Sequence, residues 1–154
     1  MSISVETNSF MIFRVKNQNY AVELTKIREI LTYKGVTEIP DSKDYILGVI
    51  NLRGQATPII DLRIRFKSKD DIKYNDKTVI LAVKVKNDKS IGYIVDEIKG
   101  IESADIGQLV EASDGDTIDN RYIKGYIKKG EDMIILVDSE HILDVHEVSK
   151  LLSK

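Results

Sequence analysis

The sequence predicts a mainly β protein made of two small antiparallel β-barrels that share a hydrophobic core, with a helix at the C-terminus. Three observations support this prediction. Short apolar runs, many of them β-branched, alternate with turn clusters rich in Gly, Asn and Asp. The second half of the chain repeats the hairpins of the first half in the same order. The last residues carry apolar side chains at helical spacing.

Two similar hairpins are expected, one in each half of the chain. In the first, residues 10–15 and 20–24 are apolar runs joined by a polar turn cluster. In the second, residues 78–85 and 91–95 are joined in the same way. The matching segments are Val15–Asn17 with Val85–Asn87, and Tyr20–Glu23 with Tyr93–Asp96.

The stretch from Tyr45 to Arg63 is the most informative part of the chain and predicts a third hairpin. Two apolar runs, residues 46–50 and 56–60, flank a polar turn over residues 51–55. Asn and Gly tolerate positive φ, so this turn can be tight. Arg53 lies in the turn among apolar neighbours, and its guanidinium must therefore pair with an oxygen acceptor or project toward a partner.

Two further matches complete an internal repeat. Tyr45–Ile50 resembles Tyr122–Ile127, Pro58–Asp61 is echoed by Ile135–Asp138, and all the matches lie about 70 to 77 residues apart. We therefore predict a single domain over residues 1–154 that contains two copies of one supersecondary unit. Their approximate limits are residues 15–85 and 86–144, with an additional N-terminal strand at residues 9–15.

Residues 139–154 are expected to form the C-terminal helix. Asp138 or Ser139 can cap its first turn. Its apolar face would comprise Ile142, Val145, Val148 and Leu152. Because each barrel alone would be small and marginally stable, we expect this helix to pack across both.

Composition excludes several classes of protein. The net charge is −2, with acidic and basic residues mixed along the chain, whereas a nucleic-acid-binding domain needs a basic face. There is no Cys, so disulfides and sulfur metal sites are excluded. No signal peptide is seen, and no apolar run approaches the roughly 18 residues of a membrane-spanning helix. We therefore expect a cytoplasmic protein that does not insert into membranes.

Catalytic, metal and cofactor sites are not expected. His141 and His146 are too far apart on the expected helix to share one metal ion. The segment Asp114–Asp116 lacks the register and the closing Glu of a calcium loop. No nucleophile and base occur in a known motif. Four carboxylates could act as acid and base, and they are Glu23, Glu29, Asp61 and Asp96. No feature of the sequence brings two of them together.

The stretch Tyr45–Arg63 closely resembles the signature of the CheW-like family, the adaptor domains of bacterial chemotaxis. Further family motifs occur in the family's order, and they are Tyr20–Val22, Ile27–Ile30, Ile39-Pro40, Val95-Asp96 and Tyr122–Gly125. The resemblance extends from about Ser9 to Asp144. It implies two five-stranded β-barrels around a shared core, and a structural function without catalysis.

The resemblance also implies partners. It implies an adaptor that couples the cytoplasmic tips of chemoreceptors to the CheA histidine kinase, within arrays at the membrane. We expect a monomer when the protein is free and no nucleic-acid partner. Two alternatives remain open at this point, a CheW-like domain of a CheV-type protein and an unrelated small-barrel module that binds peptides.

The partner-binding residues that the resemblance implies lie mainly in two segments. Ile27, Glu29 and Ile30 match a V-x-E-I segment that would offer an apolar edge and one acid to a helical partner, although both Ile residues fit a core role equally well. Arg53 matches the arginine of an N-L-R-G motif, and we predict that it pairs with Glu29 in a partly dry site. The full set is Ile27, Glu29, Ile30, Gly48, Asn51, Arg53, Gly54, Val79 and Gly92.

Overall fold

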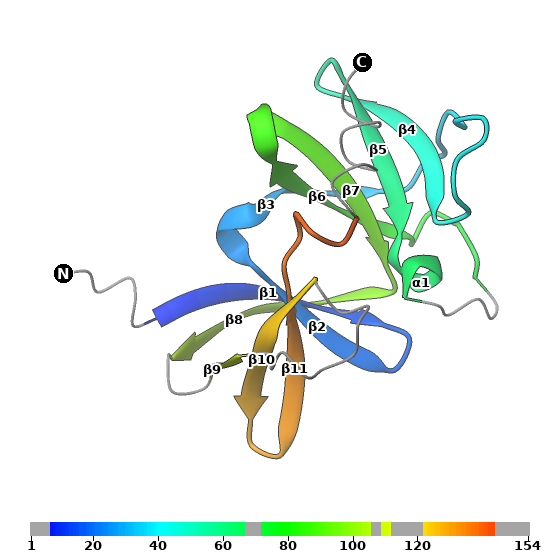
Figure 1. Cartoon of the computed structure of the whole chain (residues 1–154). Helices are drawn as coiled ribbons and strands as arrows, with labels where there is room; N and C mark the ends of the chain where they lie inside the picture. Colours follow the sequence, from blue (N-terminus) through cyan, green and yellow to red (C-terminus); the bar gives the residue numbers. More distant parts are fainter. Residues whose placement is uncertain (1–6, 67–71, 106–108, 112–121, 144–154) are drawn as a thin grey trace.

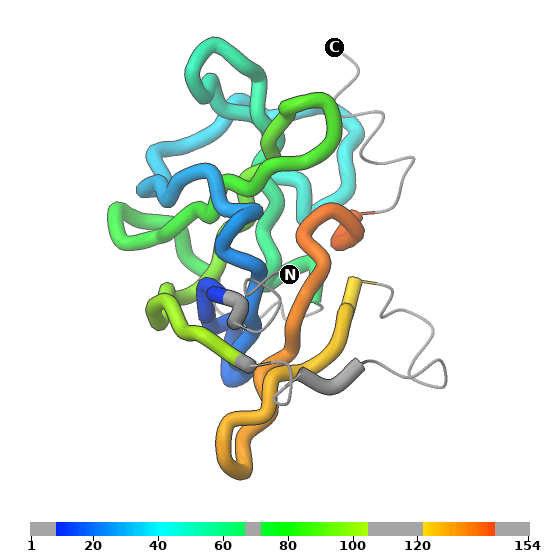
Figure 2. The backbone as a smooth tube through the Cα atoms, turned by 90° about the vertical axis from the view of Figure 1, so that its left-hand side faces the viewer, coloured from blue at the N-terminus to red at the C-terminus, as the bar shows by residue number. Residues whose placement is uncertain are grey.

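The protein folds into two β-sheets that form two lobes (Figures 1 and 2). The computed structural model describes residues 7–66, 72–105, 109–111 and 122–143. Its strands are β1 (Thr7–Val15), β2 (Gln18–Glu23), β3 (Ile27–Thr32), β4 (Ile46–Leu52), β5 (Gln55–Asp61), β6 (Val79–Val85), β7 (Lys89–Val95), β8 (Glu97–Asp105), β9 (Leu109–Glu111), β10 (Ile123–Lys129) and β11 (Asp132–Val137). Its short helices are η2 (Leu24–Lys26), α1 (Leu62–Arg65) and η3 (Lys86–Asp88).

The strand orders show that the two sheets are copies of one plan. One sheet has six strands in the order β8-β1-β2-β11-β10-β9, and the other has five in the order β3-β6-β7-β5-β4. In both, a central antiparallel hairpin is extended on one side by a parallel pair, β2 with β11 or β7 with β5. The predicted repeat is therefore present in the fold.

The two copies are interleaved. The hairpin β1–β2 pairs with β8 and β11 from the second half of the chain, whereas β6–β7 pairs with β3 and β5 from the first half. The expected units over residues 15–85 and 86–144 therefore do not coincide with the two sheets, since each sheet draws strands from both. The chain passes between the sheets at the connections β2–β3 and β7–β8.

Strand register corrects one sequence match. Leu136 lies opposite Ala21 in one sheet, and Ile59 lies opposite Gly92 in the other, so Ala21 is the counterpart of Gly92. The sequence match had instead placed Tyr20 against Tyr93. The error is two residues, which leaves the inward and outward faces unchanged because side chains alternate with a period of two.

A bulge at equivalent glycines shapes the outer hairpin of each sheet. The register shifts between Ile46 and Gly48 in β4, and between Ile123 and Gly125 in β10. Bulges of this kind bend a strand and increase its twist. In the five-stranded sheet this bend brings the free edge of β4 to the segment after β3, where Thr37 and Val49 exchange backbone hydrogen bonds of 2.9 and 2.8 Å.

One core joins the two lobes. It takes buried side chains from strands of both sheets, and also Ile142 and Leu143 from the turn after β11. Strand β1 is buried on both faces, since Met11 and Phe13 enter this shared core while Phe10 and Ile12 enter a second cluster inside the six-stranded sheet. Alternating residues of one strand thus separate two apolar layers.

Aromatic rings and one arginine also bridge the lobes. The rings of Tyr20 and Tyr122 both pack against that of Phe66, with centroid separations of 5.0 and 5.1 Å. The Arg65 guanidinium lies 5.6 Å from the ring of Tyr45 and 5.5 Å from that of Tyr122. These two tyrosines are the matched residues of the internal repeat, so one cation contacts both copies.

The predicted mainly β class, with two sheets around a shared core, is confirmed. The first sheet has six strands rather than the expected five, because the three-residue strand β9 pairs with β10. The strand orders are those of open sheets, with Thr37–Val49 as an additional bridge in the smaller one. Residues 139–143 form a turn and bends, and the rest of the helix expected over residues 139–154 lies outside the described residues.

We predict that Gly48→Ala destabilises the protein through a backbone clash. Gly48 has φ +152°, and a Cβ atom there would lie 2.2 Å from the carbonyl oxygen of Thr37. Gly100, with φ +133° and nothing within 4 Å of such an atom, provides the control. Urea denaturation should show a loss of about 2 kcal/mol more for Gly48→Ala than for Gly100→Ala. Equal losses would contradict the clash.

Candidate partner-binding surface

The tip of the β4–β5 hairpin is a two-residue turn that holds Arg53 in an uncommon conformation. Leu52 and Gln55 are the last paired residues, and Arg53 and Gly54 between them have φ +54° and +86°. Positive φ at both central residues is the pattern of a type I′ hairpin turn. The Asn51 side chain supports it by accepting a 2.9 Å hydrogen bond from the Gly54 amide. The tight turn predicted from the sequence is confirmed.

The Arg53 side chain pairs with Glu29, as the sequence predicted. Its Nε and NH2 groups lie 2.9 and 3.4 Å from the two carboxylate oxygens, so the contact is two-pronged. The hydrogen bond from Arg53 lowers the pKa of the Glu29 carboxyl, and the same contact raises the pKa of Arg53. The site is wetter than expected, since the Arg53 side chain is 74% exposed.

This ion pair connects the two edges of the five-stranded sheet. Glu29 lies on β3 and Arg53 follows β4, and these strands are the first and last of the sheet order. A non-glycine residue with positive φ is strained and persists only when its surroundings hold it there. The pair with Glu29 and the Asn51 bond supply that restraint.

Ile30 is a large apolar side chain on the exposed edge of this sheet. It is 47% exposed and lies opposite the buried Leu81. Glu29 precedes it on β3 and therefore projects from the other face of the strand. The surface around β3 and the hairpin tip thus combines an apolar side chain with an ion pair. Its predicted members are Glu29, Ile30, Asn51, Arg53 and Gly54.

The other four predicted residues lie at structural positions. Ile27 and Val79 are half-buried and pack against the shared core. Gly48 is the bulge residue described above. At Gly92 a Cβ atom would lie 2.6 Å from Ile59 Cδ1 and 2.8 Å from Ile80 Cγ2, so a larger residue there would require these buried side chains to shift. These residues shape the sheet that carries the exposed surface.

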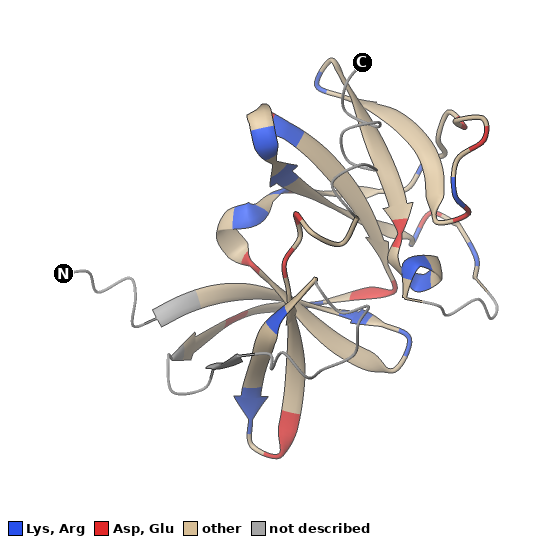
Figure 3. Ribbon diagram, viewed as in Figure 1, with Lys and Arg blue, Asp and Glu red and all other residues tan. Residues whose placement is uncertain are grey.

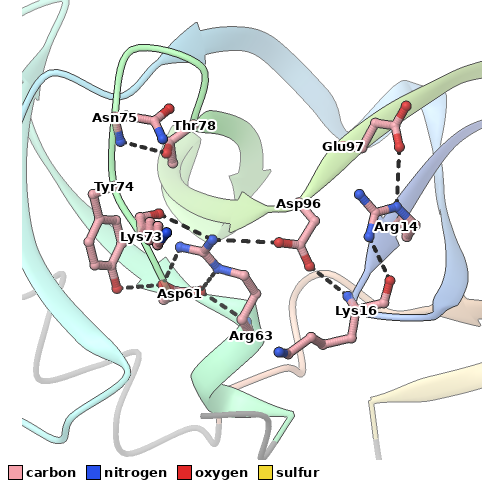
Figure 4. Close-up of polar contacts among 10 residues, drawn as sticks. All are labelled: Arg14, Lys16, Asp61, Arg63, Lys73, Tyr74, Asn75, Thr78, Asp96 and Glu97. Atoms are coloured by element: carbon pink, nitrogen blue, oxygen red, sulfur yellow. Dashed lines mark hydrogen bonds and ion pairs between the residues drawn. The ribbon is translucent and has the colours of Figure 1, made fainter. Parts of the chain in front are cut away.

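A buried ionic network near the lobe junction was missed by the sequence prediction. Asp61 is 0% exposed and accepts 2.9 Å hydrogen bonds from the backbone amide, Nε and NH2 of Arg63, and a 2.5 Å bond from the Tyr74 hydroxyl (Figure 4). Burial and this bond raise the pKa of Tyr74, so the phenol remains a donor. The two-residue spacing of Asp61 and Arg63 was the sequence feature that could have predicted this ion pair.

Asp96 extends this network to the other lobe. It lies between β7 and β8, where the chain leaves the five-stranded sheet. One of its carboxylate oxygens lies 3.5 Å from Arg63 NH1, and the other accepts a 2.6 Å bond from the amide of Lys16 in the β1–β2 turn (Figure 4). Asp61 and Asp96 are therefore linked through Arg63, and the bond from the Lys16 amide to Asp96 connects this network to the other lobe.

Metal and membrane features are not found in the described part of the chain. Within it, no group of three His, Asp or Glu side chains could hold a metal ion. Nor does it contain a helix of the length and apolarity needed to cross a membrane. His141 lies 2.7 Å from Asp138, whereas His146 and the segment 114–116 lie outside the described residues.

Comparison with known proteins identifies the family. The CheW-like domain matches residues 9–147. The chain belongs to the CheW-like family. A chemotaxis protein CheW of Klebsiella aerogenes is 35% identical over 141 residues, 91% of this chain and 84% of that protein. The CheW of Bacillus subtilis is 31% identical over 146 residues, 94% of this chain and 92% of that protein.

Structural comparison agrees with the sequence comparison. The crystal structure of the scaffolding protein TtCheW from Thermoanaerobacter tengcongensis has a TM-score of 0.80 and 26% identity, covering 90% of this CheW-like chain and 93% of that chain. The chemotaxis protein CheV3 of Helicobacter pylori is 31% identical over 133 residues, which is 81% of this chain but 41% of that protein.

We predict that Asp61→Asn strongly destabilises the protein. The substitution leaves the buried Arg63 without its main counter-charge, and breaking a buried ion pair costs about 3 to 5 kcal/mol. Asp88→Asn is the control, because it removes the partner of Arg28 at a carboxylate that is 85% exposed. Thermal unfolding followed by circular dichroism should separate the two variants clearly. Similar melting temperatures would contradict the structural importance of the network.

Proposed function

We propose that this CheW-like chain is a non-catalytic chemotaxis adaptor that couples the cytoplasmic tips of chemoreceptors to the CheA histidine kinase. The observation that carries the proposal is the CheW-like match over residues 9–147. The relatives named CheW are matched over most of their own length and CheV3 over 41% of its length, which favours a CheW-type function over a CheV-type one. The proposed location is the cytoplasmic face of a receptor array, and the free protein is proposed to be a monomer.

An adaptor of this kind acts by holding two partners in a fixed geometry. Three features support such rigidity. Each interleaved sheet joins both halves of the chain, and the shared core and the ionic network join the two lobes. The same proposal includes a single CheW-like domain over residues 1–154 in which each sheet curls into a small barrel. Individual contacts can be weak, since an array raises the effective concentration of each partner.

The proposed contact surface is the edge formed by β3 and the β4–β5 tip. Ile30 supplies exposed apolar area on one face of β3, and the Glu29–Arg53 pair holds the tip at the other face of the same strand. An apolar centre with a polar rim is the usual composition of a protein interface. In this proposal Asn51 and Gly54 shape the turn, while Ile27, Gly48, Val79 and Gly92 support the sheet from within.

We predict that Arg53→Lys weakens partner binding although the charge is kept. Lysine cannot reproduce the two-pronged contact with Glu29, so the tip loses its fixed position. Co-sedimentation with receptor cytoplasmic fragments and CheA should show a several-fold loss of bound adaptor. Arg14→Lys, at the exposed pair with Glu97 on the other lobe, is the control. Undiminished binding of both partners by Arg53→Lys would refute this role.

We further predict that Ile30→Asp abolishes binding of one partner without unfolding the protein. A charge on the apolar part of the surface would have to be desolvated in the complex, whereas in the free protein it remains in water. Ile101→Asp is the matched control, since Ile101 is a 58% exposed isoleucine on the other lobe. Titration of each variant against receptor fragment and CheA separately identifies the partner. Equal effects of the two variants would place the contact elsewhere.

A further inference from the structure

A lysine-lined pocket lies beside the connection between β2 and β3. Its volume is about 270 Å³, and it is lined by Thr25, Lys26, Lys84, Val85, Lys86 and Glu140. Three lysines and one carboxylate give it a positive charge, although the chain as a whole has a net charge of −2. Figure 3 shows basic residues gathered on this side of the five-stranded sheet.

Two of the three lysines have no partner in the described part of the chain. No ion pair or hydrogen bond there involves the ammonium group of Lys84 or Lys86, and both residues are exposed. The nearby acid Asp88 is already paired with Arg28 at 2.6 Å. Exposed lysines that repel one another gain from an added anion, because no internal carboxylate neutralises them.

The third lysine, Lys26, already binds a carboxylate. Lys26 Nζ lies 3.1 Å from a carboxylate oxygen of Glu140, a residue 114 positions away in the sequence. This hydrogen bond raises the pKa of Lys26. A carboxylate from a distant part of the chain therefore already occupies one edge of the pocket. An incoming carboxylate would compete with Glu140 for the same ammonium group.

The spacing of the lysines favours an extended ligand. Lys84 lies in β6 and Lys86 is the first residue of η3. The buried Val85 between them is extended, and both lysines are exposed. Alternate residues of a strand are about 7 Å apart, which is also the spacing of alternate acids in an extended peptide. The pocket lining has no aromatic side chain on which a nucleic-acid base could stack.

We propose that this pocket binds an extended acidic segment of a partner protein, with carboxylates at alternate positions contacting Lys84 and Lys86 and a further carboxylate competing with Glu140 for Lys26. This interaction is separate from the proposed surface at β3 and the hairpin tip. Occupancy releases the turn after β11 from its ion pair at the β2–β3 connection, so binding loosens one contact between the lobes.

The test uses the purified chain and a fluorescent peptide of alternating Glu and Gly, with an alternating Gln and Gly peptide as reference. We expect saturable binding of the Glu peptide only, and this binding should weaken as salt increases. The double variant Lys84→Glu/Lys86→Glu should lower the affinity about tenfold. Lys77→Glu, at an exposed lysine away from the pocket, should leave it unchanged. Equal weakening by Lys77→Glu would overturn the proposal.

A substitution at Glu140 should change the peptide affinity in the opposite direction. Glu140→Gln removes the internal competitor and should raise the affinity for the Glu peptide about two- to threefold, whereas Asp132→Asn, at an exposed acid of β11, should not. If Glu140→Gln does not raise the affinity for the Glu peptide, the proposed competition is refuted. Displacement of the peptide by inorganic phosphate at equal concentration would overturn the extended segment in favour of a small-anion site. The adaptor role is tested separately, since neither CheA nor receptor is present.

Discussion

The interleaving of two repeated units is the constraint on which the rest of this structure depends. Each sheet is completed by a hairpin from the other half of the chain, so neither lobe contains all its strands until both halves have folded. Strand β1 is the clearest consequence, because its two faces enter two different apolar clusters. Pairings between distant residues join the two halves of the chain within each sheet, and the shared core joins the two lobes.

Interleaving makes the chain cross between the sheets twice, and an ion pair restrains each crossing. At the β7–β8 crossing, Asp96 pairs with Arg63, which lies two residues after Asp61. At the β2–β3 crossing, Lys26 pairs with Glu140, which lies two residues after Asp138. Asp61 and Asp138 are equivalent in the repeat, since their amides donate to the carbonyls of Tyr45 and Tyr122. The two restraints thus occupy equivalent positions with reversed charge. They differ in solvent exposure: the Arg63 side chain is 8% exposed and the Lys26 side chain 37%. The second contact is therefore the weaker and the more open to competition by an external anion.

The proposed adaptor surface and the proposed acidic-segment pocket use this framework in different ways. The surface at β3 depends on a strained turn that an ion pair restrains, which suits a contact whose geometry must be transmitted. The pocket depends on exposed lysines and a displaceable carboxylate, which suits a weaker contact that depends on salt. An adaptor with both would combine a geometrically defined contact with an adjustable one.

The amino-acid sequence predicted the mainly β class, the repeat, the tight turn at Arg53 and the Glu29–Arg53 pair. These follow from local patterns, namely apolar alternation, turn chemistry and the family motif around Arg53. It did not determine which half of the chain supplies which strand, because strands of both copies have similar sequences and either pairing buries the same alternating faces. Nor did it find the partners of Asp61 and Asp96, or the pocket formed by Lys26, Lys84, Lys86 and Glu140. The Asp61–Arg63 pair had only its two-residue spacing as a signal, whereas the partners of Asp96 and the pocket residues come from distant parts of the chain, and such contacts depend on the tertiary structure.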